Sequence, residues 1–211
     1  MVLFLLISTP ITFFLVNIFF NNKGIRKRVI LMPLLIGMLL SIPYFLFYWS
    51  FINSFFNNWT PGGVYFFHFL KRNGSASIYI TLFIATYFLL SDKKTVSRLR
   101  EIAAYVAGFI FTLGVYDVLV YESWYGVLEL FILPFNRIAL FLALSIFLNR
   151  FLTSKDWKKY IWIGFAVLLP FFLNFLPYIA SYNKGTISLV LSVVLSLVSF
   201  FFFILEGREL T

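Results

Sequence analysis

The residues most able to do chemistry lie in one stretch, DVLVYESWYGVLELFILPFNR, which spans positions 117–137. It holds Asp117, Glu122, Glu129, Asn136 and Arg137 within sequence that is otherwise strongly apolar. Carboxylates can take up and release protons, and a guanidinium can bind a carboxylate or a phosphate through two parallel hydrogen bonds. Such groups are costly in hydrocarbon, so the surrounding elements must give them partners.

Arg137 is the most demanding of these residues. It lies eleven residues after Gly126, which is ~16 Å along a helix that starts there, near the middle of a bilayer. An unpaired arginine at that depth costs from ~2.5 to more than ~10 kcal/mol. We therefore expect Arg137 to share a water-accessible cavity, open to the outside, with Glu129 or with Asp117 on the neighbouring helix. The alternative is a structural arginine that binds a backbone carbonyl or a partner subunit.

Proline residues interrupt the apolar runs. Pro134 cannot donate to the carbonyl of Leu130, which predicts a kink one turn before Asn136 and Arg137. Pro170 and Pro177 predict a bend in a later helix, where Asn174 is a candidate donor to the freed carbonyls. Broken helices serve transporters as hinges and ligand sites, although prolines are also common in membrane helices generally.

The region 51–74 predicts a short helix at the outer membrane interface. Thr60 and Pro61 are typical of a helix start, and Asn73 and Gly74 of a helix end. His68 lies between them among aromatic residues. It is either a member of an aromatic belt at headgroup level or a proton-transfer or substrate-contact group in a lid over the cavity.

The last apolar run carries a stripe of small side chains. Serines recur there every three or four residues, so they share one helix face against bulky neighbours. This face favours close packing against another helix of the same chain, and contact with a partner protein is the alternative. The stripe consists of Ser188, Ser192, Ser196 and Ser199.

Composition defines the class of protein. Of 211 residues, 62% are hydrophobic and only 12% are charged, which indicates a membrane protein rather than a water-soluble one. The chain has no cysteine and a single histidine, which excludes disulfides, thiol catalysis and multi-histidine metal sites. We expect no metal, no cofactor and no nucleic-acid partner.

Seven apolar runs are long enough to cross ~30 Å of hydrocarbon as helices. The prediction is an all-α bundle of about seven spans that forms a single integral membrane domain over residues 1–211. The predicted spans are 2–20, 29–50, 75–91, 102–121, 126–148, 160–182 and 186–205.

The distribution of charge predicts orientation. Most of the 17 basic residues fall in one alternate set of loops, which by the positive-inside rule are cytoplasmic. The N-terminus is then outside and the C-terminus is inside, as expected for a multi-pass protein of the cell membrane. The loops of this set hold Lys23, Arg26, Lys27, Arg28, Lys93, Lys94, Arg98, Arg100, Arg150, Lys155, Lys158 and Lys159, and Arg208 follows in the tail.

The sequence favours two classes of function over others. The first is a permease-like transport or translocation subunit with possible membrane or ATPase partners, whose outward-opening cavity is lined by Asp117, Glu129, Asn136 and Arg137. The second is a membrane enzyme acting on a lipid or lipid-linked substrate at the outer leaflet, with a phosphate held by Arg137 or by Lys71 and Arg72, and with His68, Asp117 or Glu129 moving protons. A non-catalytic assembly subunit is the third possibility. Familiar catalytic motifs are absent from the sequence, and no catalytic residue is assigned.

Overall fold

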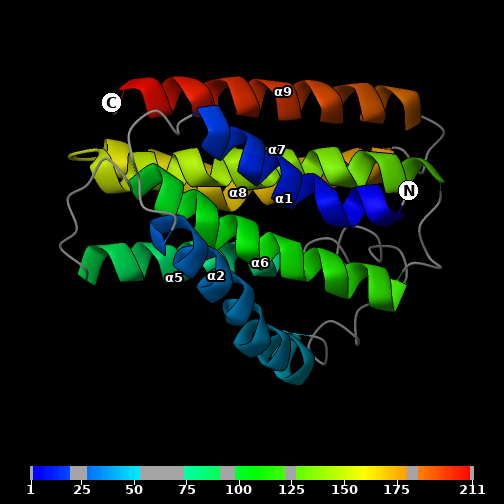
Figure 1. Ribbon diagram of the computed structural model, residues 1–211, viewed down its shortest axis with the longest axis horizontal. Coiled ribbons are helices and arrows are strands. Elements are labelled where there is room, and N and C mark those ends of the chain that lie inside the picture. Colours follow the sequence, from blue (N-terminus) through cyan, green and yellow to red (C-terminus); the bar gives the residue numbers. More distant parts are fainter. Residues whose placement is uncertain are drawn as a thin grey trace.

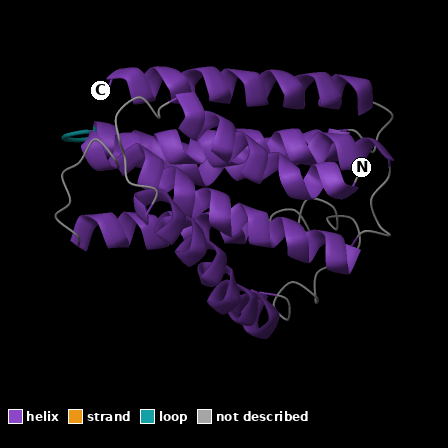
Figure 2. Ribbon diagram, in the orientation of Figure 1, coloured by secondary structure: helices purple, strands orange, loops and turns teal. Residues whose placement is uncertain are grey.

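The computed structural model describes residues 2–19, 28–52, 74–90, 98–121, 127–179 and 185–209. In this part of the chain the architecture is all-α, with seven α-helices packed into one bundle (Figures 1 and 2). The helices are α1 (Val2–Phe19), α2 (Arg28–Phe47), α5 (Ser75–Leu90), α6 (Arg98–Tyr121), α7 (Val127–Thr153), α8 (Lys158–Ile179) and α9 (Gly185–Glu209), and a short π-helix, η2 (Tyr48–Ile52), extends α2.

Each predicted apolar run coincides with one of these helices. Four stretches of the described chain are long and apolar enough to cross a membrane, namely Ile30–Ser50, Arg98–Tyr116, Phe131–Thr153 and Gly185–Gly207. Two shorter apolar helical segments, Leu6–Asn17 and Ser75–Leu90, lie beside them. These helices indicate a multi-pass membrane protein.

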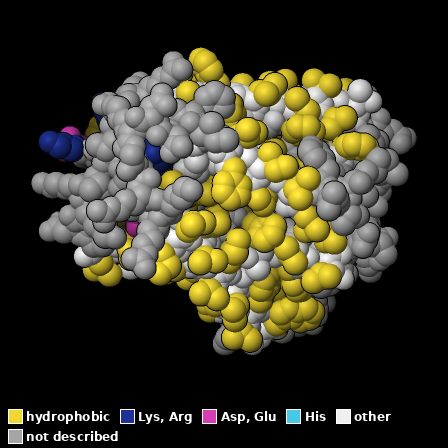
Figure 3. Space-filling model, in the orientation of Figure 1, with side chains coloured by type: hydrophobic (Ala, Val, Ile, Leu, Met, Phe, Trp, Pro, Cys, Tyr) yellow, Lys and Arg dark blue, Asp and Glu magenta, His cyan; other side chains and the backbone are white. Residues whose placement is uncertain are grey.

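The surface of the bundle is also typical of a membrane protein. Apolar side chains cover most of the described surface in Figure 3, and the Lys and Arg side chains of that view lie toward the left end, where the C-terminus lies in Figure 1. We call this the basic end of the bundle, defined by Arg98, Arg150, Lys155 and Lys158. A water-soluble protein would not expose so large a continuous apolar surface, so lipid is the natural solvent for the middle of the bundle.

Three helices extend further at the basic end than the apolar runs predict. The α6 helix begins at Arg98 rather than at position 102, α7 continues to Thr153 rather than to 148, and α9 continues to Glu209 rather than to 205. Hydropathy falls at charged residues, but backbone hydrogen bonding does not stop there. The extra turns bring Asn149, Arg150 and Glu206 into regular helix.

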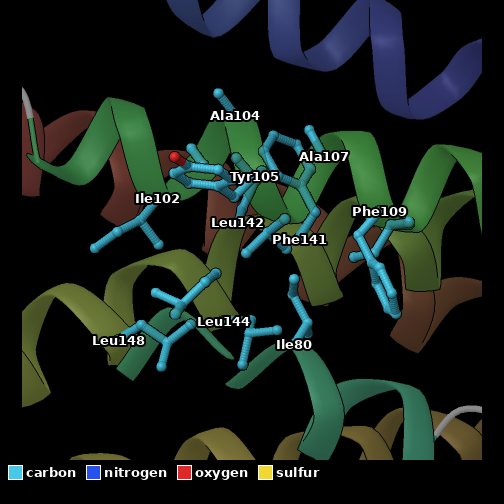
Figure 4. Close-up of a cluster of buried hydrophobic side chains, with 14 of the residues drawn as sticks. Ile80, Ile102, Ala104, Tyr105, Ala107, Phe109, Phe141, Leu142, Leu144 and Leu148 are labelled. Atoms are coloured by element: carbon cyan, nitrogen blue, oxygen red, sulfur yellow. The ribbon is translucent and has the colours of Figure 1, made fainter. Parts of the chain in front are cut away.

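The core lies around α6 and α7. From Leu99 to Ile110 almost every side chain of α6 is buried, which is typical of a helix surrounded by others. Figure 4 shows part of this core, where Ile102 and Phe109 of α6 lie near Phe141 and Leu144 of α7, with Ile80 of α5. The polar residues of α6 and α7 are thus held on helices fixed from several sides.

Two glycines bring α2 and α6 into backbone contact. A Cβ at Gly37 would lie 2.2 Å from the carbonyl oxygen of Tyr105, and a Cβ at Gly108 would lie 2.1 Å from that of Leu34. Only glycine fits at such distances, so these residues fix where the two helices cross. This pair is not among the residues expected from the sequence to position helices.

A short turn at the basic end joins α7 to α8. Ser154 donates its backbone N–H to the carbonyl of Arg150 at 2.9 Å, and Asp156 has a φ of 58°, a conformation that Asp tolerates better than most residues. The turn reverses the chain, so α7 and α8 run side by side in opposite directions. Asn136 of α7 and Leu173 of α8 lie at comparable distances from this turn and therefore meet.

The predicted interfacial helix and its His68 lie outside the described residues, as do Lys71 and Arg72 and the basic clusters at 23–27 and 93–94.

Candidate functional site

Arg137 lies inside the bundle, between α7 and α6. Only 8% of its surface is exposed. Its guanidinium lies against the backbone of Gly114 on α6, where an added Cβ would be 2.7 Å from Nη1. Arg137 is ten residues into α7 and therefore ~15 Å from the start of that helix. Arg137 is therefore enclosed by protein at this level of the bundle.

Asn136, the preceding residue, faces a different helix. It is 7% exposed, and its Nδ2 donates to the backbone carbonyl of Leu173 on α8 at 3.0 Å. Consecutive residues of a helix point ~100° apart, which explains why Asn136 contacts α8 while Arg137 contacts α6. The two side chains thus join three helices, α6, α7 and α8, at one level of the bundle.

The hydrogen bond to Leu173 also sets the orientation of the Asn136 amide. A carbonyl oxygen only accepts, so the nitrogen of the amide must face Leu173 and the oxygen must face away. The Oδ1 atom is buried and has no hydrogen-bond partner among the described residues. A buried acceptor of this kind is suited to a donor from water or from a ligand.

The acidic candidates are placed only by their backbones. Asp117 is three residues after Gly114 on α6, which puts its Cα one turn further along the helix on a similar side. Glu129 is in the first turn of α7. Their side chains lie outside the described part of the structure, so the predicted cavity shared with Arg137 stays a prediction.

Pro134 is buried in α7, which is continuous from Val127 to Thr153. The α8 helix is continuous from Lys158 to Ile179, so the bend predicted in it stays a prediction. One of the carbonyls expected to lack a donor within α8 has a donor from another helix. Asn174 was the candidate donor, and its side chain lies outside the described residues, whereas Asn136 of α7 donates to Leu173. A hydrogen bond from one helix to another depends on how the two helices pack. No local pattern in the sequence predicts it.

A second polar cluster lies at the basic end of the bundle, and it was not predicted from the sequence. Glu206 of α9 is 6% exposed and accepts hydrogen bonds from Asn149 Nδ2 at 2.9 Å and from Arg150 Nε at 2.7 Å. Arg150 Nη2 forms an ion pair with the same carboxylate. Two signals were available: Glu206 lies at the end of an apolar run, and Asn149-Arg150 repeats the Asn136-Arg137 dipeptide.

Three of the four serines of the α9 stripe face the bundle interior, and Ser199 is partly exposed. Ser188, Ser192 and Ser196 are buried, and α9 packs on α7 and α8. The hydroxyls of Ser192 and Ser196 donate to carbonyls of their own helix, those of Ser188 and Val193, each at 2.8 Å. Packing within the chain accounts for this burial, and contact of the stripe with a partner protein stays a prediction.

Comparison with known proteins gives no relative from which a role could be transferred: no protein family, no curated protein and no solved structure matches this chain.

Proposed function

We propose that the chain is a transport or translocation subunit of the cell membrane that binds an anionic group at Arg137. The observation that carries the proposal is the burial of the Arg137 guanidinium on the bare backbone of Gly114, between α6 and α7. Burying arginine in a membrane bundle is expensive, and intramembrane charges typically mark substrate or ion pathways. The orientation follows the charge distribution, with the C-terminus cytoplasmic and the site opening outward.

The polar atoms at this level define a class of ligand. The guanidinium presents planar donors that match a carboxylate or a phosphate. Gly114 has no side chain, which leaves room for the guanidinium itself against the backbone of α6. Asn136 Oδ1 is an acceptor that suits a hydroxyl or ammonium group. A small anion that also carries a hydrogen-bond donor fits this combination.

Asp117 and Glu129 are the proposed counter-charges. Asp117 follows Gly114 by one turn of α6, within the reach of a long arginine side chain. A carboxylate there would neutralise Arg137 in the empty site, and an incoming anion would replace it. The displaced carboxylate would take up a proton as the anion binds, so that no charge is left unpaired in the membrane.

The ligand can be tested by purifying tagged protein from its native membrane in mild detergent and identifying everything bound by mass spectrometry. We expect a small anion to stay with the wild type and with Arg137→Lys, and to be lost from Arg137→Gln. A stoichiometric membrane or ATPase partner, retained by every variant, would define the chain as a subunit. The same bound molecules in wild type and Arg137→Gln would contradict the anion site.

Outward access can be tested with single cysteines, because the chain has none of its own. Leu133 and Leu144 are both buried leucines of α7, one turn before Arg137 and almost two turns after it. We expect a small membrane-impermeant thiol reagent, added from outside, to label Leu133→Cys and not Leu144→Cys in folded protein. No labelling of Leu133→Cys would contradict an outward-opening site.

A further inference from the structure

The bond between Asn136 and Leu173 lies where α8 lacks one of its own backbone hydrogen bonds. A proline at position 177 has no N–H, so the carbonyl four residues earlier, that of Leu173, has no donor within its own helix. This is the carbonyl that accepts from Asn136 Nδ2 at 3.0 Å. The side chain of α7 therefore takes the place of the missing N–H of α8.

The surroundings show why a substitute donor matters. Leu173 and Leu176 of α8 are buried with Ala139 of α7 in a small apolar cluster. Water has little access to a carbonyl in such surroundings, and an unsatisfied carbonyl there destabilises the fold. The donor must therefore come from the protein.

We propose that Asn136 replaces the N–H that Pro177 lacks and thereby holds this part of α8 against α7, directly beside Arg137. Since Asn136 adjoins Arg137, the same bond holds α7 and α8 together at the level of the guanidinium.

The test is a double-mutant cycle on thermal unfolding of the purified full-length protein. Asn136→Leu keeps the branching and the number of heavy atoms of the side chain and removes the donor. In the wild-type background we expect Asn136→Leu to lower the Tm by on the order of 2–8 °C, because the Leu173 carbonyl loses its donor. In the Pro177→Ala background the new N–H of residue 177 satisfies that carbonyl, so Asn136→Leu should change the Tm by under about 1 °C.

The chain supplies a matched control in Pro170. This proline interrupts the same helix but frees the carbonyl of Ala166 instead. Asn136→Leu should therefore lower the Tm in the Pro170→Ala background as much as in the wild type. If Pro177→Ala does not fold, Pro177→Ser serves, because any residue other than proline restores the N–H.

Equal losses of Tm in all three backgrounds would overturn the inference, since the cost of Asn136→Leu would then have no connection with Pro177. This readout needs no ligand. The coupling between Asn136 and Pro177 can be found even if no anion binds at Arg137. It can also be absent while an anion does bind there.

Discussion

The α7 helix carries the dipeptide Asn-Arg twice, and its two copies have different surroundings. At the basic end, Asn149 and Arg150 both donate to the carboxylate of Glu206 on α9. Thirteen residues earlier, Asn136 donates to a backbone carbonyl of α8 and Arg137 lies on the backbone of α6. The copies are ~140° apart around the helix, which is why they meet different neighbours.

The different surroundings indicate that one Asn-Arg dipeptide stabilises the fold and that the other can bind a ligand. In the pair at the basic end, one carboxylate offers oxygens to the amide and to the guanidinium, and the charges cancel within the described residues. In the other pair, the Asn136 amide oxygen has no described partner and the neighbouring backbone is glycine. We therefore expect substitutions of the basic-end pair to affect mainly stability, and substitution of Arg137 to affect mainly binding.

The largest effect is expected at Glu206. The Glu206→Leu substitution leaves the donor of Asn149 buried without an acceptor, while Arg150, whose side chain is 39% exposed, can turn toward water. We expect the free energy of unfolding to fall by about 2–3 kcal/mol, measured by thermal or denaturant unfolding in detergent.

The double variant Asn149→Leu with Glu206→Leu sharpens this result. Removing the buried donor along with its acceptor should recover part of the loss, because apolar replacements of a buried polar pair are often tolerated. If Glu206→Leu were as stable as the wild type, the bonds from Asn149 and Arg150 to Glu206 would not contribute to stability, and the proposed difference between the two Asn-Arg dipeptides would be wrong.

The helices themselves could be predicted because a run of apolar residues suffices to define a membrane helix. The Glu206 cluster could not, although its residues are all visible in the sequence. Hydropathy ends each apolar run before Asn149, Arg150 and Glu206, so the sequence predicts a loop or the tail at these positions. Only the packing of α7 on α9 shows that they share one carboxylate.

The two arginines should respond in opposite ways to the same substitution. We expect Arg137→Gln to fold and to lose anion binding by about 10–100-fold, the loss of one or two charge-assisted hydrogen bonds. We expect Arg150→Gln to keep binding and to lose stability. Binding can be measured as the rise in Tm on adding phosphate, acetate or lactate, which grows with the ligand concentration relative to Kd.

Lactate is the informative probe in this series, because it joins a carboxylate to a hydroxyl donor. Equal loss of anion-induced stabilisation in Arg137→Gln and Arg150→Gln would show that the effect is indirect. No stabilisation of the wild type by any of the three anions would count against small anions of these classes.

The smallest effect is expected at Gly114. A methyl group there would press on Arg137 Nη1, the end of a flexible side chain, so the guanidinium can shift at little cost to folding. We expect Gly114→Ala to weaken anion binding by a few-fold and to change the free energy of unfolding by less than about 1 kcal/mol.

The control for this prediction is Gly164→Ala in α8, where an added Cβ meets nothing within 4 Å. Both substitutions gain helix propensity of up to about 1 kcal/mol, but only Gly114→Ala displaces the guanidinium. Gly164→Ala should leave binding unchanged. If Gly114→Ala and Gly164→Ala bind the anion equally well, the position of Arg137 on Gly114 is not important for binding.

Arg137 itself could be recognised from the sequence, because a charge deep within an apolar run must be buried in the protein. Its neighbours could not. Gly114 is one of 11 glycines, and nothing nearby in the sequence marks it as the surface on which a guanidinium lies. The acceptor of Asn136 is a backbone carbonyl, which every residue has, so only the alignment of α7 with α8 selects Leu173.

The crossing of α2 and α6 at Gly37 and Gly108 has a consequence for the lipid around the protein. In Figure 1, α2 runs obliquely to the other helices, and its far end leaves the bundle. A tilted helix covers less membrane thickness than an upright one of the same length. We expect α2 to respond to a thicker or thinner bilayer by changing its tilt about the glycine contact, while the helices of the core keep theirs.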